Sequence, residues 1–305
     1  MRRVLLAAAA ICVLPIWRLS AQDVRLFGYL QPRFESVGDS ALFKLRRARL
    51  GAQGGLTPWA RFRVQAELRS GGDTAKASVQ AIDLWIAVAK GRWSATFGQL
   101  KTPFAREFLL SSTVLELSER PLVVDALAPN RDVGAMVEWH VQRIVIAQAG
   151  VFNGDGINRA SNSDKRLLYI ARVVLAPGGG LELGGAAATY GDSSRWNVEA
   201  ALRRGPLSAR AEFLRQEYDF SAGRAEGWYA FAAYFVRPER VQLAARLERY
   251  DPTRAAADRR TGYTAGGQYL LRGDDLKLQV DYAIFEEEGP AVDVNRLVVQ
   301  MQVRF

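Results

Sequence analysis

Apolar and polar residues alternate along most of this chain after its first twenty residues. The last segment, Val299-Gln300-Met301-Gln302-Val303-Arg304-Phe305, alternates without a break and ends in an aromatic residue. Successive side chains of a β-strand point to opposite faces, so such a segment has one apolar and one polar face. The pattern is typical of a transmembrane β-barrel strand, and also of a half-buried edge strand in a soluble sheet.

Sixteen alternating segments, each about ten residues long and closed by turn-forming residues, follow one another along the chain. They run near residues 24–35, 41–54, 59–69, 79–89, 92–100, 132–141, 143–152, 166–175, 181–190, 195–204, 207–218, 226–236, 240–250, 261–271, 275–286 and 293–305. Outer-membrane barrels made from one bacterial chain have an even number of strands. The count therefore favours a barrel.

The links between these segments differ in length in a regular way. After every even-numbered segment the link is short, and all of these links except Val141-Gln142 contain Gly or Pro, as in Gly205-Pro206. Several links after odd-numbered segments are longer, notably 101–131, 153–165 and 251–260. Short turns at one rim and longer loops at the other are typical of a barrel whose termini are both periplasmic. We predict one all-β domain, an antiparallel transmembrane β-barrel of sixteen strands formed by residues 22–305.

The first 21 residues have the features of a secretory signal peptide. Met1-Arg2-Arg3 is basic, Val4 to Ile16 is mostly apolar, and Ser20-Ala21 provides small residues for cleavage. The only cysteine of the chain, Cys12, lies in this segment, so we expect the mature chain to have neither a disulfide nor a thiolate metal site. Its removal also takes away three arginines and leaves 38 basic against 32 acidic residues.

Alternation within the strands indicates which side chains face water. In segment 59–69, Phe62, Val64 and Leu68 share one face, and a second face carries Arg61, Arg63, Gln65, Glu67 and Arg69. Arg or Lys at the bilayer midplane costs about 2–4 kcal/mol in barrels, so the charged face is expected to line the lumen. The arginines are spread over the strands rather than gathered in one patch, which argues against a nucleic-acid-binding protein.

Residues 101–131 form the longest link and are predicted to fold into the barrel. A barrel of sixteen strands encloses an aqueous channel unless something fills it. The link contains the apolar groups Phe108-Leu109-Leu110 and Val114-Leu115, which would form an exposed apolar patch if the link lay outside the barrel. Folded inward, it would narrow the lumen and present Lys101, Arg106 and Arg120 to the channel.

Several spaced motifs in the chain resemble the phosphate-selective porin O and P family. These are Arg46-Arg47-Ala48-Arg49-Leu50, Gly98-Gln99-Leu100-Lys101-Thr102-Pro103-Phe104, Ser118-Glu119-Arg120, the run from Asp125 to Gly134, and Val151-Phe152-Asn153-Gly154-Asp155-Gly156. The resemblance covers essentially the whole mature chain. It implies a sixteen-stranded outer-membrane barrel, commonly a homotrimer, whose third loop narrows an anion-conducting pore and whose C-terminal strand is recognised by the barrel assembly machinery.

The chain also departs from this family. Members selective for phosphate use several lysines at the constriction, whereas the mature chain here has only six, of which Lys101 alone belongs to the inward loop. Arginine forks can also hold phosphate, so anion passage is better supported than phosphate selectivity. Alternation fails at Arg46-Arg47, where a β-bulge would leave Arg47 and Arg49 inward. The expected pore and anion-binding residues are Lys101, Arg106, Arg120, Arg61, Arg63, Arg69, Arg47, Arg49 and Arg131.

We therefore expect an outer-membrane porin for small inorganic anions such as phosphate or polyphosphate, embedded in outer-membrane lipid, without a cofactor, a metal or enzymatic activity. Two alternatives remain open. A lipid hydrolase would need a nucleophile and a base, but the only histidine, His140, lies at a tight turn and no nucleophile-elbow motif is present. A barrel plugged by its own loop would be a non-conducting scaffold or adhesin. The oxygen-rich loop around Asp155 and Asp164 could bind Ca²⁺, although its spacing does not match an ordered ion-binding loop.

Overall fold

The computed structural model is a closed barrel of sixteen antiparallel strands. It describes residues 22–69, 77–159, 161–162, 164–218, 223–253, 258–288 and 294–305. Each strand pairs with its neighbours in sequence, and β1 closes the barrel on β16. The predicted signal peptide, residues 1–21, lies outside the described residues. The predicted sixteen-stranded barrel is confirmed.

The strands agree with the sixteen alternating segments to within three residues at each end. Their bounds are β1 (Gln22–Val37), β2 (Ser40–Thr57), β3 (Ala60–Arg69), β4 (Ser78–Lys90), β5 (Trp93–Lys101), β6 (Arg131–Gln142), β7 (Val145–Phe152), β8 (Leu168–Gly178), β9 (Leu181–Tyr190), β10 (Ser193–Arg204), β11 (Leu207–Tyr218), β12 (Gly223–Arg237), β13 (Val241–Asp251), β14 (Arg260–Arg272), β15 (Leu276–Glu287) and β16 (Val294–Arg304). Links 38–39 and 191–192, at the rim with the longer loops, are also short hairpins.

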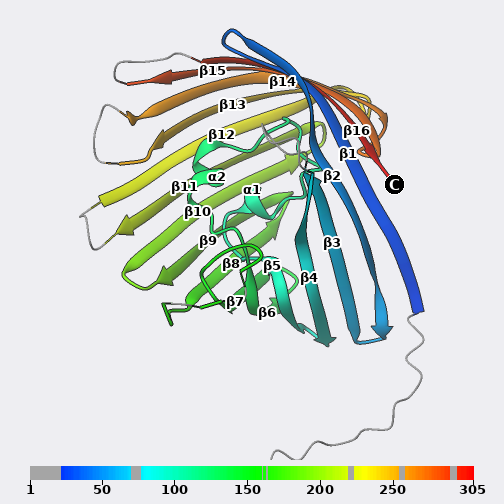
Figure 1. Ribbon diagram of the computed structural model, residues 1–305, viewed down its shortest axis with the longest axis vertical. Helices are drawn as coiled ribbons and strands as arrows, with labels where there is room; N and C mark the ends of the chain where they lie inside the picture. Colours follow the sequence, from blue (N-terminus) through cyan, green and yellow to red (C-terminus); the bar gives the residue numbers. More distant parts are fainter. Residues whose placement is uncertain are drawn as a thin grey trace, which may run out of the picture.

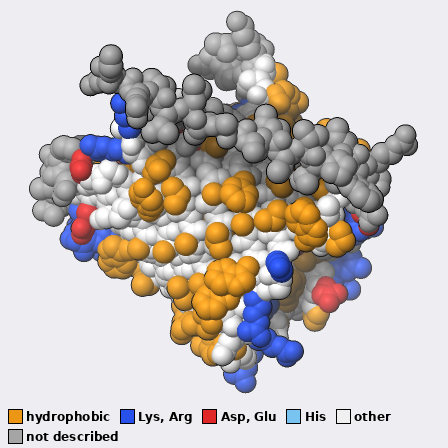
Figure 2. Space-filling view, turned by 90° about the horizontal axis from the view of Figure 1, so that it is seen from below, with side chains coloured by type: hydrophobic (Ala, Val, Ile, Leu, Met, Phe, Trp, Pro, Cys, Tyr) orange, Lys and Arg blue, Asp and Glu red, His pale blue; other side chains and the backbone are white. Residues whose placement is uncertain are grey.

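The two faces of the sheet have opposite character, as alternation predicts. In β3, Val64 and Leu68 are exposed on the outside, whereas Gln65 and Glu67 on the inner face are only 3% and 4% exposed. Hydrophobic side chains spread over the middle of the outer surface seen in Figure 2, with charged side chains mainly toward its ends. Trp93 and Trp139 stack on this surface with ring centroids 4.8 Å apart, at the rim with the tight turns, where membrane barrels carry aromatic girdles.

A β-bulge interrupts the pairing of β1 with β2 at Pro32. Gln31 pairs with Arg47 and Pro32 with Leu45, so Arg46 has no partner in the register. Proline has no backbone N–H to donate to the ladder, which explains the irregularity at this position. The predicted bulge is confirmed. Arg46, Arg47 and Arg49 all contact inward side chains, because the bulge turns Arg46 to the same side as Arg47.

The segment between β5 and β6 folds into the barrel, as predicted (Figure 1). We call residues 102–130 the inward loop. It contains two short helices, α1 (Arg106–Leu109) and α2 (Leu122–Leu127), and α2 contacts β11, β12 and β13. Val123 and Val124 of α2 are fully buried, in a hydrophobic cluster that includes Leu214 and Tyr229 of the wall. Burial of these apolar side chains holds the loop inside.

Within the described residues, no helix is long and apolar enough to span a membrane.

The two ends of the barrel meet at a seam between β1 and β16. The N–H of Gly28 donates to the carbonyl oxygen of Phe305 over 2.9 Å, and the N–H of Phe305 donates to that of Gly28 over 3.0 Å. The inward loop is tied to this seam as well. Gln31 of β1 and Gln302 of β16 bond to each other over 2.7 Å, and both donate to loop carbonyl groups.

Candidate functional site

The inward loop packs on one side of the lumen. The N–H groups of Arg106 and Glu107 donate to the Glu212 carboxylate of β11 over 2.9 Å and 2.7 Å. Further along the loop, the ammonium of Lys277 on β15 donates to the carbonyl oxygen of Leu115 over 2.9 Å. These bonds fix the loop backbone against β11 and β15. Beside β1–β5, part of the lumen stays open.

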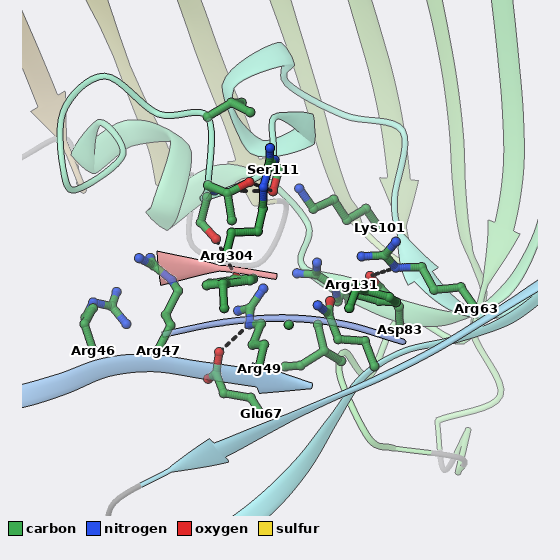
Figure 3. A pocket seen from close by; sticks show the side chains of 18 of the residues that line it. Arg46, Arg47, Arg49, Arg63, Glu67, Asp83, Lys101, Ser111, Arg131 and Arg304 are labelled. Atoms are coloured by element: carbon green, nitrogen blue, oxygen red, sulfur yellow. Dashed lines mark hydrogen bonds and ion pairs between the residues drawn. The ribbon is translucent and has the colours of Figure 1, made fainter. Parts of the chain in front are cut away.

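This open side is a cavity of about 1110 Å³, bounded by the inner faces of β1–β6, the inward loop and the C-terminal end of the chain. Eleven basic and four acidic residues line it, a formal excess of seven positive charges. Figure 3 shows the labelled basic side chains turned toward the same space. The basic residues are Arg25, Arg46, Arg47, Arg49, Arg63, Arg69, Lys101, Arg120, Arg131, Arg272 and Arg304, and the acidic ones are Glu67, Asp83, Asp125 and Asp275.

Two carboxylates on the wall are each shared by two arginines. Asp83 of β4 accepts from Arg131 over 2.7 Å and from Arg63 over 3.3 Å. Glu67 of β3 accepts from Arg49 over 2.5 Å and from Arg69 over 3.1 Å. One carboxylate cannot neutralise two guanidinium groups, so each cluster keeps one positive charge. Each arginine also has five N–H donors and uses only some of them here.

Glu119 of the inward loop is bound by three arginines. Its carboxylate oxygens lie 2.6 Å from Arg33, 2.7 Å from Arg46 and 3.6 Å from Arg47. Burial acts to raise the pKa of Glu119, but the guanidinium groups of Arg46, Arg47 and Arg33 outweigh it and hold this pKa well below its usual range. These three guanidinium groups therefore favour the ionised form of Glu119.

Two further cations are held by neutral carbonyl oxygens. Lys101 donates to the carbonyl groups of Phe108, Leu109 and Leu110 over 2.7, 3.1 and 2.8 Å. Arg120 donates to those of Glu107 and Leu110 over 3.0 and 2.7 Å. Cations are favoured at the C-terminal carbonyl groups of a helix, which here is α1. Because the acceptors are neutral, these bonds bring no negative charge to the two cations, which both line the cavity.

Aromatic rings lie beneath two of the arginines. The guanidinium of Arg63 lies 4.1 Å from the ring centroid of Phe27, and that of Arg49 lies 5.7 Å from the ring centroid of Tyr29. Such cation–π contacts are worth about 0.5–1 kcal/mol at exposed sites and restrict the motion of the side chain. The tyrosine also bonds to Ser112 of the inward loop over 2.7 Å, so the ring links β1, the arginine and the loop.

A family model described as phosphate-selective porin O and P matches residues 27–191 and 181–305. The chain belongs to this family. It is therefore a porin of the outer membrane, in agreement with the resemblance noted in its motifs. A comparison with curated proteins by sequence found no match.

Several solved structures share the fold. An anion-selective porin from Comamonas acidovorans superposes with a TM-score of 0.71 at 14% identity, over 93% of this chain and 99% of that one. The outer membrane channel DcaP of Acinetobacter baumannii gives 0.67 at 12% identity, over 93% and 97% of the two chains. OmpT of Vibrio cholerae in its trimer form gives 0.67 at 12% identity, over 93% and 99%. At these identities the likeness concerns the fold.

Seven of the nine residues predicted for the pore of this porin line the cavity. They are Arg47, Arg49, Arg63, Arg69, Lys101, Arg120 and Arg131. Arg46 also lines the cavity although it was not predicted, because strict alternation assigns only one of two consecutive residues to the lumen and the bulge turns both inward. Arg25, Arg272 and Arg304 also line the cavity near the rim with the tight turns.

The other two predicted residues lie outside the cavity. Arg106 extends to the far wall, where its guanidinium bonds to Glu182 of β9 at 2.8 Å. Its backbone N–H is fixed by Glu212, so the side chain starts on the face of the loop that turns away from the cavity. Arg61 pairs with Ala87 of β4 two positions closer to the tight turns than Arg63, and it is exposed there. Alternation alone does not predict that the side chains of Arg106 and Arg61 lie outside the cavity.

The residues considered for other chemistry lie at the rims. His140 bonds to Glu138 over 2.9 Å at the turn end of β6 and is exposed. Asp164 accepts from the hydroxyl of Tyr190 over 2.7 Å, and the N–H of Arg166 holds its pKa below the usual range. Among the described residues, no group of three or more His, Cys, Asp or Glu side chains is placed to hold a metal ion.

Proposed function

We propose that this porin conducts small anions through the cavity between the inward loop and β1–β5, with phosphate-like oxyanions among them. The excess of seven positive charges around this cavity carries the proposal. Its physical basis is that positive side chains in a narrow, poorly screened channel raise the local concentration of anions, and rings of Arg or Lys favour anions over cations.

The sharing of carboxylates explains how the wall keeps its charge. Arginines would be neutralised if each met its own carboxylate, but Asp83 and Glu67 each serve two. The guanidinium donors left over can bond to an oxyanion in fork geometry as it moves from one arginine to the next. Because no single arginine has to bind tightly, an anion can also leave, which conduction requires.

Reversal potentials in a salt gradient across a planar bilayer test the proposal. The wild-type porin is expected to be anion-selective, and a cation-selective pore would contradict it. Asp83→Asn should increase the selectivity, because it removes the carboxylate that Arg63 and Arg131 share. Asp192→Asn is the control, since Asp192 pairs with Arg166 outside the residues that line the cavity. A protein that passes no current at all would favour the alternative of a plugged scaffold.

Phosphate as a solute is a finer part of the same proposal. The cavity has one lysine and ten arginines, so an oxyanion would be met mainly by guanidinium forks. We expect inorganic phosphate to reduce the chloride current in a concentration-dependent way, and pyrophosphate, which carries more charge, to do so at lower concentration. If neither ion reduced the current more than nitrate does, the pore would be a general anion channel.

We also propose that the porin assembles as a homotrimer in the outer-membrane lipid after insertion by the barrel assembly machinery. Support comes from membership in the family and from the trimer form of the Vibrio cholerae relative in fold. The mass of the purified, unheated protein in detergent tests the oligomeric state. A monomeric mass with full conductance would remove the trimer from the proposal.

A further inference from the structure

Glu119 of the inward loop lies where three arginines converge. Its Oε1 accepts from Arg33 over 2.6 Å and from Arg46 over 2.7 Å, and its Oε2 lies 3.2 Å from Arg46 and 3.6 Å from Arg47. The side chain of Arg33 is only 1% exposed, so this arginine forms the back of the site. Arg46 and Arg47 line the cavity in front. An ion in the cavity would therefore meet the same guanidinium groups that hold Glu119.

The charges of this cluster do not cancel. Arg33 also contacts Glu35 at 3.3 Å, and Glu35 is held by Lys44 at 2.7 Å. Three arginines and one lysine thus meet two carboxylates, which leaves two positive charges even with Glu119 in place. The guanidinium N–H groups around the two oxygens of Glu119 are the donors. Donors arranged in this way also bind phosphate and other oxyanions.

A second carboxylate of the loop, Glu116, has the opposite surroundings. It pairs with Arg210 of β11 at 2.8 Å, and the same arginine also pairs with Glu107 at 2.5 Å. Two carboxylates thus share one arginine, on the side of the loop away from the cavity. Glu116 and Glu119 both anchor the inward loop to the wall through buried arginine. Of the two, only Glu119 is bound by arginines that line the cavity, namely Arg46 and Arg47.

We propose that Arg33, Arg46 and Arg47 form an oxyanion-binding site that Glu119 itself occupies, so that this carboxylate is a tethered competitor of the solute. The inference rests on the proposed function and concerns how strongly the channel holds its anion. With Glu119 in place, passing oxyanions meet a site that is already filled and are released quickly. Without its charge, the same three guanidinium groups hold an oxyanion long enough to block the smaller chloride ion.

Phosphate inhibition of the chloride current through single porins in a planar bilayer tests this. Glu119→Gln keeps the size and one acceptor oxygen of the side chain but removes its charge. We expect half-inhibition at a phosphate concentration about tenfold or more below that of wild type, which corresponds to about 1.4 kcal/mol or more. Glu116→Gln removes another largely buried carboxylate from the same loop. It should leave half-inhibition within about twofold of wild type, since its partner Arg210 does not line the cavity.

Two further variants separate competition from a loss of loop anchoring. Glu119→Asp keeps the charge on a shorter side chain, so it should stay near wild type in phosphate inhibition although the contacts change. The double variant Arg46→Gln/Glu119→Gln should need a higher phosphate concentration for half-inhibition than Glu119→Gln alone, because it lacks one guanidinium group of the site. If Glu119→Gln does not insert, Glu119→Ala provides the same test.

Equal half-inhibition in wild type and Glu119→Gln, with both pores anion-selective, would overturn the tethered competitor and leave the proposed function intact. The same decrease of the half-inhibition concentration in Glu116→Gln as in Glu119→Gln would overturn it too, because loosening of the loop would then be the cause. A cation-selective wild type would instead contradict the proposed function.

Discussion

The Nζ atom of Lys101 lies 2.8 Å from the carbonyl oxygen of Leu110, so the last residue of β5 binds the end of the first turn of the loop that follows it. The same ammonium bonds to Phe108 and Leu109. Lys101, which was predicted to face the channel, therefore uses all three of its N–H donors on the loop. It lines the cavity and fixes α1 at the same time.

Lys101→Met should loosen the inward loop and reduce anion selectivity together. The substitution leaves carbonyl groups of a partly buried turn without their donor, which costs about 1–3 kcal/mol for each group that water cannot reach. We expect a noisier open-channel current and a smaller reversal potential in a salt gradient. Lys90→Met is the control, because Lys90 is exposed at the tight turn between β4 and β5 and does not line the cavity. Quiet currents in Lys101→Met would show that apolar packing alone holds the loop.

Arg106 and Arg131 should differ in their effect on selectivity although both were predicted for the pore. Arg131→Gln removes a cation from the cavity and leaves Asp83 with one arginine fewer, so the reversal potential should fall. Arg106→Gln removes a cation paired with Glu182 on the far side of the loop, so the reversal potential should stay near wild type. The pair of single variants, measured in the same gradient, checks the placement. An equal decrease of the reversal potential in both variants would mean that the solute also passes between the inward loop and the far wall.

Anion selectivity should rise as the pH falls below neutral, because Asp125 gains its proton at a higher pH than an ordinary aspartate does. Enclosure by the protein raises the pKa of this α2 carboxyl above its usual value, although Arg120 acts to lower it. Asp125 lines the cavity, so its protonation removes one negative charge there. Reversal potentials at several pH values measure the effect. Asp125→Asn should show the higher selectivity at neutral pH and a flatter pH profile, and an unchanged profile would assign the titration to another group.

Gly28→Ala should impair closure of the barrel. A Cβ at this position would lie 2.7 Å from the backbone oxygen of Arg49 and 2.7 Å from the ring of Phe305. The ring can move aside, but the backbone oxygen belongs to the β1–β2 ladder and cannot move without straining it. We expect a smaller folded fraction on unheated gels. Leu26→Ala, two residues away on the same outer face, is the control and should fold normally.

Alternation predicted the barrel well because the membrane imposes one simple rule on every strand. Val64 and Leu68 had to face lipid, and this fixed Gln65 and Glu67 inside. The inward position of the long link was also predictable, since Val123, Val124 and their neighbours would otherwise have been exposed. Hydrophobic burial is a property of each residue type, so it can be inferred without knowledge of the partner.

The placement of the pore residues depended on partners far away in the sequence. Arg106 faces the far wall because Glu212, more than one hundred residues later, binds its backbone N–H. Arg46 enters the lumen because Pro32 on the neighbouring strand interrupts the ladder. For Arg46 the sequence contained a signal, because Pro32 of β1 lies opposite the broken alternation of β2. For Arg106 it contained none, since nothing near this residue indicates which face of the loop it lies on.

The bonds from Gln31 and Gln302 to the tip of the inward loop give the seam a second consequence. These two residues come from the first and the last strand. Their side chains bond to each other, and they also donate to the carbonyl oxygens of Ser112 and Thr113. The pairing of β1 with β16 that closes the barrel wall therefore also completes the hydrogen bonds that hold Ser112 and Thr113.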